Sequence, residues 1–172
     1  VDLEMRRYRP HYKQRVIDKD LVAAQFYSNR GMELAAEGNT REGFLYLRKA
    51  LLMSQEPSYI WSNFGSFYRR LGFSDEAEAI YLHGLKVNPR DYTIMHNLAG
   101  LYKDTGNLAQ HQYYQERVRK HRNANPYYIY RRALEASEQQ DYAKALQLIK
   151  KAIKKEKDEI RFYRLAVTIY DA

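Results

Sequence analysis

The sequence repeats itself every 34 residues, and this period restricts the chain to folds that stack one small structural unit. Asn29, Asn63 and Asn97 are separated by 34 residues each. Three further positions repeat in phase with them: a small residue (Gly31, Gly65, Ala99), a large one (Leu34, Tyr68, Tyr102) and a glycine (Gly38, Gly72, Gly106). A unit of this size cannot bury an apolar core alone, so each copy must pack against its neighbours.

The segment from Ser58 to Asp91 is the clearest copy of the unit and predicts two helices. In its first half, large and small residues line one helix face at the spacing i, i+3, i+4, i+7: Trp61, Phe64, Gly65 and Tyr68. Gly72 is placed to end that helix, and Pro89 to end the next one. The face of the second helix carries Ala77, Tyr81, Gly84 and Leu85. Because Gly65 and Ala77 are small, we expect the two helices to approach closely.

Two helical stretches in a 34-residue unit with these residues resemble the tetratricopeptide repeat, and the resemblance covers residues 24–172. It implies an all-α fold, a solenoid in which antiparallel helix pairs stack into a right-handed superhelix. We expect a repeat domain at residues 23–172, preceded at 1–22 by an arm or by a linker from an upstream domain. The repeats are predicted at 24–57, 58–91, 92–125 and 126–158, followed at 159–172 by a capping or half-repeat helix.

The first and third copies carry further signals in their second helices. Asn39 and Glu42 predict a capping box, in which each side chain bonds a backbone N–H of the other's turn. In the third copy His111 stands where a small residue is expected, and Gln115 where an aromatic one is expected. The sequence therefore leaves the register of that helix open, and His111 is interpreted as a structural or groove-lining histidine.

The resemblance implies that residues of each first helix face a concave groove. An asparagine amide has donors and an acceptor, so Asn29, Asn63 and Asn97 can bond the backbone of an extended peptide. This arrangement resembles the asparagine ladder in the repeat domain of O-linked N-acetylglucosamine transferases; hydrogen bonds within the repeat are the alternative. Arg131 and Arg70 are expected to bind acidic side chains, and three tyrosines to supply contact area. The full set of predicted peptide-binding residues is Asn29, Asn63, Asn97, Arg131, Arg70, Tyr59, Ser62, His96, Tyr127 and Tyr130.

Composition excludes several other classes of function. The chain of 172 residues has no cysteine, which excludes disulfides, thiolate metal sites and a catalytic thiol. No catalytic constellation, metal-ligand cluster or phosphate-binding loop is recognisable, so we expect no enzyme activity, no cofactor, no metal and no small-molecule substrate. No apolar stretch has the length of a membrane span. The cytoplasm is favoured as the compartment, and the periplasm stays open if a signal precedes Val1.

The net charge of +8 favours an acidic partner. The basic and aromatic stretch at 127–132 could stack bases, but at helical spacing we interpret it as packing, so nucleic acid is not the expected partner. The predicted function is a non-catalytic protein–protein interaction module, a scaffold or targeting domain, that binds an extended, acidic segment of another protein. Apolar residues in the last helix (Tyr163, Leu165 and Ile169) also suggest a homo-oligomer formed through exposed solenoid ends.

The leading segment suggests an alternative function. Residues 1–12, with the short stretches 16–18 and 24–27, resemble the junction in bacterial proteins that carry a transglutaminase-like domain before tetratricopeptide repeats. That resemblance implies an accessory or substrate-docking domain whose catalytic part lies upstream. A pilus or secretion assembly factor of the same fold is a further alternative.

Overall fold

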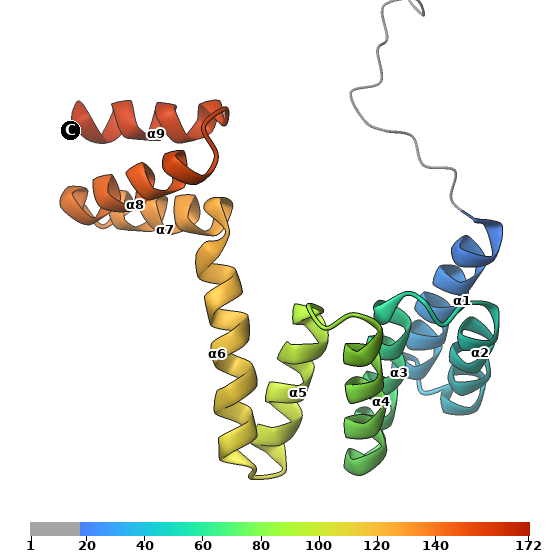
Figure 1. Ribbon diagram of the computed structural model, residues 1–172. Helices are drawn as coiled ribbons and strands as arrows, with labels where there is room; N and C mark the ends of the chain where they lie inside the picture. Colours follow the sequence, from blue (N-terminus) through green and yellow to red (C-terminus); the bar gives the residue numbers. More distant parts are fainter. Residues whose placement is uncertain (1–17) are drawn as a thin grey trace, which may run out of the picture. The chain divides into compact units, whose positions relative to one another are not determined.

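A computed structural model describes residues 18–172, in which every regular element is an α-helix (Figure 1). The helices are α1 (Lys19–Ala36), α2 (Thr40–Met53), α3 (Ser58–Arg70), α4 (Ser74–Val87), α5 (Tyr92–Asp104), α6 (Leu108–Ala124), α7 (Pro126–Glu138), α8 (Tyr142–Lys155) and α9 (Ile160–Tyr170). Most of the residues that resemble a transglutaminase-linked junction lie outside the described range. The upstream enzyme therefore stays a prediction.

The helices divide into two compact units, where the sequence predicted one repeat domain. The first unit ends at Asp91 and holds α1 to α4, and the second spans Tyr92–Ala172 and holds α5 to α9. Each predicted repeat span corresponds to one pair of helices, but α1 begins at Lys19, within the segment 1–22 that was predicted as an arm or linker. The exact repeat boundaries stay predictions. The two units are described separately below.

In the first unit, glycines let the paired helices come into close contact. A Cβ atom at Gly31 of α1 would lie 2.9 Å from the carbonyl oxygen of Gly43 on α2. A Cβ at Gly65 of α3 would lie 2.6 Å from the ring of Tyr81 on α4. Real Cβ contacts are longer, so glycine is required at both positions. The predicted close approach at Gly65 is present, and α3 also packs on α1 and α2.

The turns within the pairs explain the glycines that repeat in the sequence. Gly38, Gly72 and Gly106 have φ values of +90°, +86° and +78°, in the left-handed region that favours glycine after a helix. In the fourth pair this place is taken by Gln140, with φ +61°. The backbone conformation is therefore kept where the sequence signal is missing.

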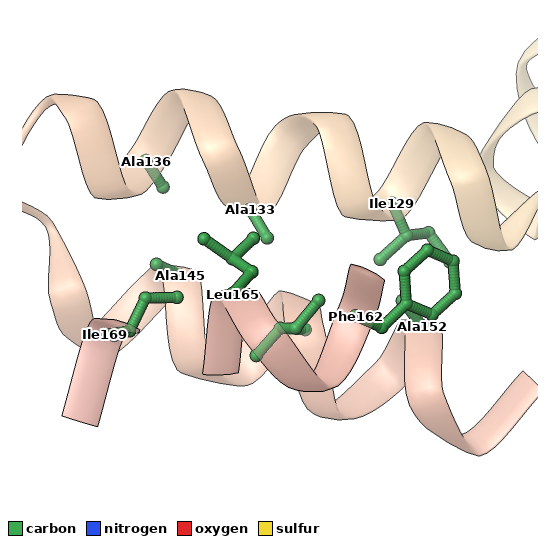
Figure 2. Packing of buried hydrophobic residues seen from close by; sticks show 9 residues of the cluster. Ile129, Ala133, Ala136, Ala145, Ala152, Phe162, Leu165 and Ile169 are labelled. Carbon is green, nitrogen blue, oxygen red and sulfur yellow. The ribbon is translucent and has the colours of Figure 1, made fainter. Parts of the chain in front are cut away.

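In the second unit, α7, α8 and α9 lie side by side and share one apolar core (Figure 1). Its buried members are Ile129, Ala133, Ala136, Ala145, Ile149, Ala152, Phe162, Leu165 and Ile169. Phe162, Leu165 and Ile169 of α9 point toward α7 and α8 (Figure 2). The last helix thus packs on the fourth pair as the first helix of a further repeat does.

Helix α6 departs from the repeat pattern at two positions, and different contacts replace the expected ones. The ring Nδ1 of His111 lies 2.7 Å from the carbonyl oxygen of Ala99 on α5, to which it donates a hydrogen bond. Gln115 is exposed, and its neighbour Tyr114 is buried and stacks on Tyr102 at 5.8 Å between ring centroids. The aromatic contact expected at position 115 is therefore made one residue earlier, by Tyr114.

The predicted capping box of α2 is wrong. Asn39 is the N-cap residue, but its side chain makes no capping hydrogen bond. Thr40 instead donates from its hydroxyl to the carbonyl oxygen of Gly38 at 3.5 Å.

Candidate peptide-binding surface

The predicted peptide-binding residues fall into two groups, one in each unit. The first unit holds five of them on α1 and α3: Asn29, Tyr59, Ser62, Asn63 and Arg70. The second unit holds the other five on α5 and α7: His96, Asn97, Tyr127, Tyr130 and Arg131.

Asn63 is fixed in place by a hydrogen bond between neighbouring first helices. Its side-chain Nδ2 on α3 donates to the hydroxyl of Ser28 on α1 at 2.9 Å. Ser28 is fully buried, whereas Asn63 is half-buried. An amide has two N–H groups and a carbonyl oxygen, so this bond leaves one N–H and the oxygen for a ligand. This bond joins successive repeats, so it differs from the hydrogen bonds within the repeat that were the alternative from the sequence. It orients the Asn63 side chain without using up its polar groups.

Asn29 occupies the corresponding position one repeat earlier and is exposed. Its amide makes no hydrogen bond to any residue of the described range. Because α1 and α3 contact each other, the two amides lie on one face of neighbouring helices. This face, formed by Asn29, Asn63 and the surrounding residues of α1 and α3, is named the α1–α3 face.

Two predicted residues of this unit are less available than expected. Ser62 is only 4% exposed, because its side chain lies inside the helix packing, so it cannot contact a ligand in this structure. The hydroxyl of Tyr59 is buried and has no hydrogen-bond partner among the described residues, and this burial raises the pKa of the phenol. Arg70, by contrast, is exposed at the end of α3 and available to an anionic group.

In the second unit, Tyr127 and Tyr130 both rest on the buried Phe162. The ring centroids lie 5.6 Å apart for Tyr127 and 5.0 Å for Tyr130. Tyr127 stays exposed, with 46% of its surface accessible, while Tyr130 is half-buried. Phe162 thus couples both predicted contact residues to the α7–α9 core.

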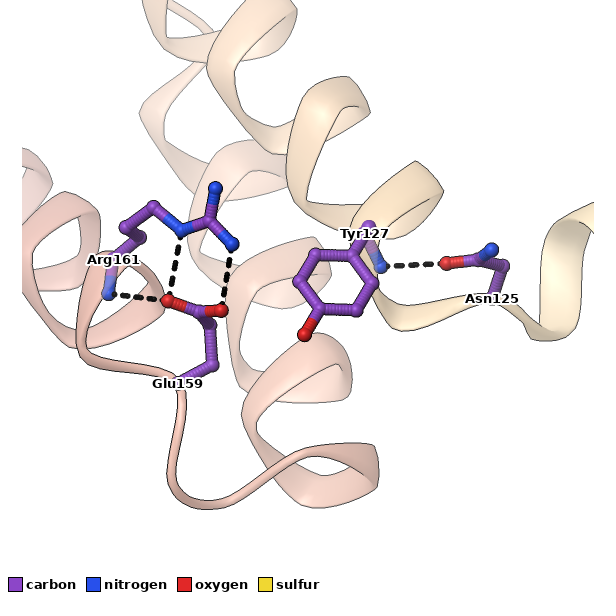
Figure 3. Close-up of polar contacts among 4 residues, drawn as sticks. All are labelled: Asn125, Tyr127, Glu159 and Arg161. Carbon is purple, nitrogen blue, oxygen red and sulfur yellow. Dashed lines mark hydrogen bonds and ion pairs between the residues drawn. The ribbon is translucent and has the colours of Figure 1, made fainter. Parts of the chain in front are cut away.

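An ion pair borders Tyr127 at the start of α9 (Figure 3). The guanidinium of Arg161 donates to both carboxylate oxygens of Glu159, at 2.8 Å and 2.7 Å. These bonds lower the pKa of Glu159 to about 2 and raise the pKa of Arg161. The same guanidinium lies over the ring of Tyr127, 5.6 Å from its centroid. The charges of Arg161 and Glu159 beside Tyr127 therefore balance each other.

Arg131 is exposed and held loosely on its own helix. Its Nε lies 3.6 Å from Glu135, and its guanidinium lies 5.2 Å from the centre of the Tyr128 ring. An exposed pair of this kind contributes little to stability, so Arg131 can exchange Glu135 for a ligand carboxylate. On α5, His96 is exposed and Asn97 half-buried.

Sequence reasoning missed a cavity in the first unit. Its volume is about 470 Å³, within the range of ligand-sized pockets. Its lining combines aromatic and apolar side chains with a polar rim: Thr40, Arg41, Phe44, Phe67, Tyr68, Leu71, Phe73 and Glu76. The signal in the sequence was the set of aromatic residues outside the repeat positions, such as Phe44 and Phe73.

Two further features were sought among the described residues: clusters of metal-ligating side chains and helices that could cross a membrane. Residues 18–172 contain no group of three or more histidine, aspartate or glutamate side chains that could hold a metal ion. Among the described helices, none combines the length and the apolar content needed to cross a bilayer.

Comparison with known protein families identifies one repeat in the chain. A family model for the tetratricopeptide repeat matches residues 58–91, the segment that holds α3 and α4. Residues 58–91 form a tetratricopeptide repeat. No curated protein matches the chain by sequence.

Solved structures of tetratricopeptide repeat proteins share the fold. MamA of Desulfovibrio magneticus is 16% identical with a TM-score of 0.53, over 86% of this chain and 83% of its own. PilF of Pseudomonas aeruginosa is 14% identical with a TM-score of 0.57, over 88% of this chain and 69% of its own. A tetratricopeptide repeat protein of Parabacteroides merdae is 20% identical with a TM-score of 0.52, over 86% of this chain and 59% of its own. The predicted family and the predicted all-α helical-repeat fold are confirmed.

Tetratricopeptide repeats serve as protein–protein interaction modules, and the repeat fold assigns this chain to that class. The fold alone does not identify the surface that binds or the partner that is bound. Those are inferred from the side chains of the two units.

Proposed function

We propose that the chain binds an extended segment of another protein across the α1–α3 face of its first unit. The observation that carries the proposal is Asn63, whose amide is held by Ser28 while one N–H and the carbonyl oxygen remain for a ligand. A side chain fixed before binding loses little conformational entropy when it binds.

The spacing of the two asparagines suits an extended peptide. Packed helices lie about 8–10 Å apart, and an extended chain advances about 3.3 Å per residue. Amides at equivalent positions of α1 and α3 therefore match peptide groups about three residues apart. Backbone recognition of this kind accepts many sequences, so specificity falls to the neighbouring side chains.

Exposed cations supply a preference for acidic segments. Arg70 is exposed on α3, in the same unit as the two asparagines. In the second unit, exposed Arg131, beside the ring of Tyr128, offers a separate contact of the same character. The net charge of +8 adds a long-range attraction for acidic partners.

The test begins with a ligand selected for the purpose. Phage-displayed random 12-residue linear peptides are selected on the immobilised chain, and the affinity of the best peptide is measured by fluorescence anisotropy. One amide hydrogen bond contributes about 0.5–1.5 kcal/mol, so Asn29→Ala and Asn63→Ala should each weaken binding about three- to tenfold. Asn39→Ala is the matched control, because Asn39 is exposed and its side chain caps nothing.

The variants also separate binding from folding. Asn29→Ala should lower affinity with no change in melting temperature, because its amide has no hydrogen-bond partner in the described range. If both variants bind as tightly as the Asn39→Ala control, the asparagines do not hold the peptide and the proposal fails.

A further inference from the structure

The cavity of the first unit lies where the second repeat departs from the other three. It is lined by the start of α2, the end of α3 and the turn that leads into α4, and is named the α2–α4 pocket. Leu71 and Phe73 line it and are 41% and 50% exposed. At multiples of 34 residues from these two, the other repeats carry polar side chains: Glu37, Thr105 and Gln139 for Leu71, and Asn39, Asn107 and Asp141 for Phe73. The repeat itself therefore does not require apolar residues here.

Phe73 stands in place of a helix cap. It is the N-cap residue of α4, which has no side-chain capping hydrogen bond. At the equivalent positions of α6 and α8, Asn107 accepts a hydrogen bond from the N–H of Gln110, and Asp141 from the N–H of Lys144. Loss of a capping side chain destabilises a helix. A half-exposed ring at this position is therefore better explained by binding than by folding.

Aromatic rings form the wall of the α2–α4 pocket. The ring centroids of Phe44 and Phe67 lie 6.2 Å apart, and those of Tyr68 and Phe73 also lie 6.2 Å apart, with the second pair edge to face. Phe67 is buried with Leu47, so the wall is supported from behind. Such rings attract a further ring in offset or edge-to-face geometry, and the volume of about 470 Å³ leaves room for one. The pocket therefore suits an aromatic side chain.

Two opposite charges stand on the rim of the pocket. Arg41 in the first turn of α2 and Glu76 in the first turn of α4 both line it, and both are exposed. Among residues 18–172, neither side chain has an ion-pair partner. Complementary charges on a ligand are an acidic group beside Arg41 and a basic group beside Glu76. The rim thus favours an aromatic residue with an acidic neighbour on one side and a basic neighbour on the other.

The α2–α4 pocket does not lie at an end of the repeat array. Both helix pairs that form it are complete, and α3 packs directly on α1 and α2. An additional repeat before α1 or after α9 would extend the array and would add no helix between these two pairs. The chain enters α1 at Lys19, whereas the pocket lies beside the turns of Gly38 and Gly72, at the other end of that helix (Figure 1). In a helix of 18 residues these ends are about 27 Å apart.

We infer that the α2–α4 pocket binds an aromatic side chain of a partner protein, on a segment that carries an acidic residue on one side of the ring and a basic residue on the other. Arg41 pairs with the acidic residue and Glu76 with the basic one, while the ring packs against Phe73. A repeat that serves protein interactions favours a protein segment over a free small molecule. The pocket is separate from the α1–α3 face and does not depend on the function proposed for it.

Four pentapeptides with blocked ends test the inference. Two carry tryptophan between opposite charges, Glu-Ala-Trp-Ala-Lys and the reverse order Lys-Ala-Trp-Ala-Glu. The third, Gln-Ala-Trp-Ala-Gln, is neutral, and the fourth replaces the tryptophan of the tighter charged peptide by alanine. Affinity for the whole chain is measured by fluorescence anisotropy of the labelled peptides, and free tryptophan is tested as a competitor. Exposed ion pairs are weak, so we expect one charged order to bind about threefold more tightly than the reverse order and the neutral peptide. Loss of the ring should weaken binding at least tenfold.

Variants of the chain locate the binding and separate it from folding. Phe73→Asn introduces the residue that caps α6, so the urea midpoint should stay unchanged or rise while peptide affinity falls at least tenfold. Phe26→Asn is the matched control, because Phe26 is an exposed phenylalanine of α1 outside the pocket, and affinity should change less than twofold. Exchanging the charges, Arg41→Glu together with Glu76→Arg, should reverse the preferred peptide order.

Three results would overturn the inference. A clear fall of the urea midpoint in Phe73→Asn would mean that the ring is part of the fold or is covered by another part of the chain. Equal affinity of the two charged orders, or a preference that the charge exchange leaves unchanged, would exclude the roles of Arg41 and Glu76. Free tryptophan that binds as tightly as the best peptide would make the ligand a small molecule and not a protein segment.

Discussion

Three residues of α9, Tyr163, Val167 and Tyr170, stand three repeat periods after Trp61, Gly65 and Tyr68 of α3. Among the described residues, helix α4 packs on these positions of α3, whereas the same positions of α9 are exposed. On α3 the central residue is Gly65, which the ring of Tyr81 touches directly. On α9 it is Val167, which is 59% exposed. The comparison shows that equivalent repeat positions need not contribute equally to stability: a residue at this position stabilises the fold where a second helix packs on it, and contributes little where the described residues leave it exposed.

The largest contrast is expected between the two sides of α9 itself. Phe162→Ala should destabilise the second unit by about 3–5 kcal/mol, because the ring is fully buried and its removal leaves a cavity. Tyr163→Ala, one residue further, should cost less than about 1 kcal/mol, because that ring is half-exposed. Urea unfolding followed by circular dichroism measures both. Equal losses would mean that α9 does not have one buried and one exposed side.

The next contrast exchanges the residues at the central position of these two helices. Gly65→Val should destabilise the first unit by about 2–3 kcal/mol, because any Cβ at this position meets the Tyr81 ring. Val167→Ala on α9 should be neutral or slightly stabilising, because alanine is the better helix former at an exposed position. Both effects are measured as shifts of the urea midpoint. A Gly65→Val variant as stable as the parent chain would contradict the close contact between Gly65 and the Tyr81 ring.

Asn63 is expected to have a smaller but measurable role in folding. The sequence alone predicts that alanine at the asparagine positions weakens binding without lowering the melting temperature. The bond from Asn63 to buried Ser28 changes this expectation, and Asn63→Ala should cost about 1 kcal/mol. Asn29→Ala is the control and should leave the melting temperature unchanged. Identical thermal stability of the two variants would count against the hydrogen bond.

The smallest effect concerns the start of α9 and depends on pH. Arg161 lowers the pKa of Glu159 to about 2, below the ordinary value of 4.5. The carboxylate therefore stabilises the fold above pH 4.5, and this contribution disappears as the pH falls from 4.5 toward 2. Glu159→Gln should be less stable than the parent chain at pH 7 and nearly equal to it at pH 2. A gap in urea midpoint that is constant from pH 7 to pH 2 would refute this assignment.

Most of the fold could be predicted from the sequence because the same residue types recur at equivalent positions of successive repeats. The glycines after the first helices recur at fixed spacing, and each has the positive φ that the pattern indicates. Gln140 adopts the same conformation without the signal, because its place in the pair dictates the turn. Helix α6 could not be read in the same way, since Tyr114 rather than residue 115 makes the aromatic contact.

The candidate site was less predictable, because exposure depends on how neighbouring helices pack. Periodicity placed Ser62 and Asn63 side by side on α3, but only the structure separates a buried serine from a half-buried asparagine. The bond between Asn63 and Ser28 joins residues of successive repeats, so the spacing of residues within one helix could not predict it. The cavity beside Phe44 and Phe73 arises in the same way, from residues of α2 and of the turn before α4.

The central claim is that the Asn29 and Asn63 amides of the α1–α3 face hold a peptide. It is tested most directly by nitrogen-15 NMR of side-chain amide groups during titration with the selected 12-residue peptide. The account predicts that the Asn29 and Asn63 side-chain signals shift and saturate together, while the Asn39 signal stays in place. Saturating binding that leaves the Asn29 and Asn63 amides unmoved would contradict it.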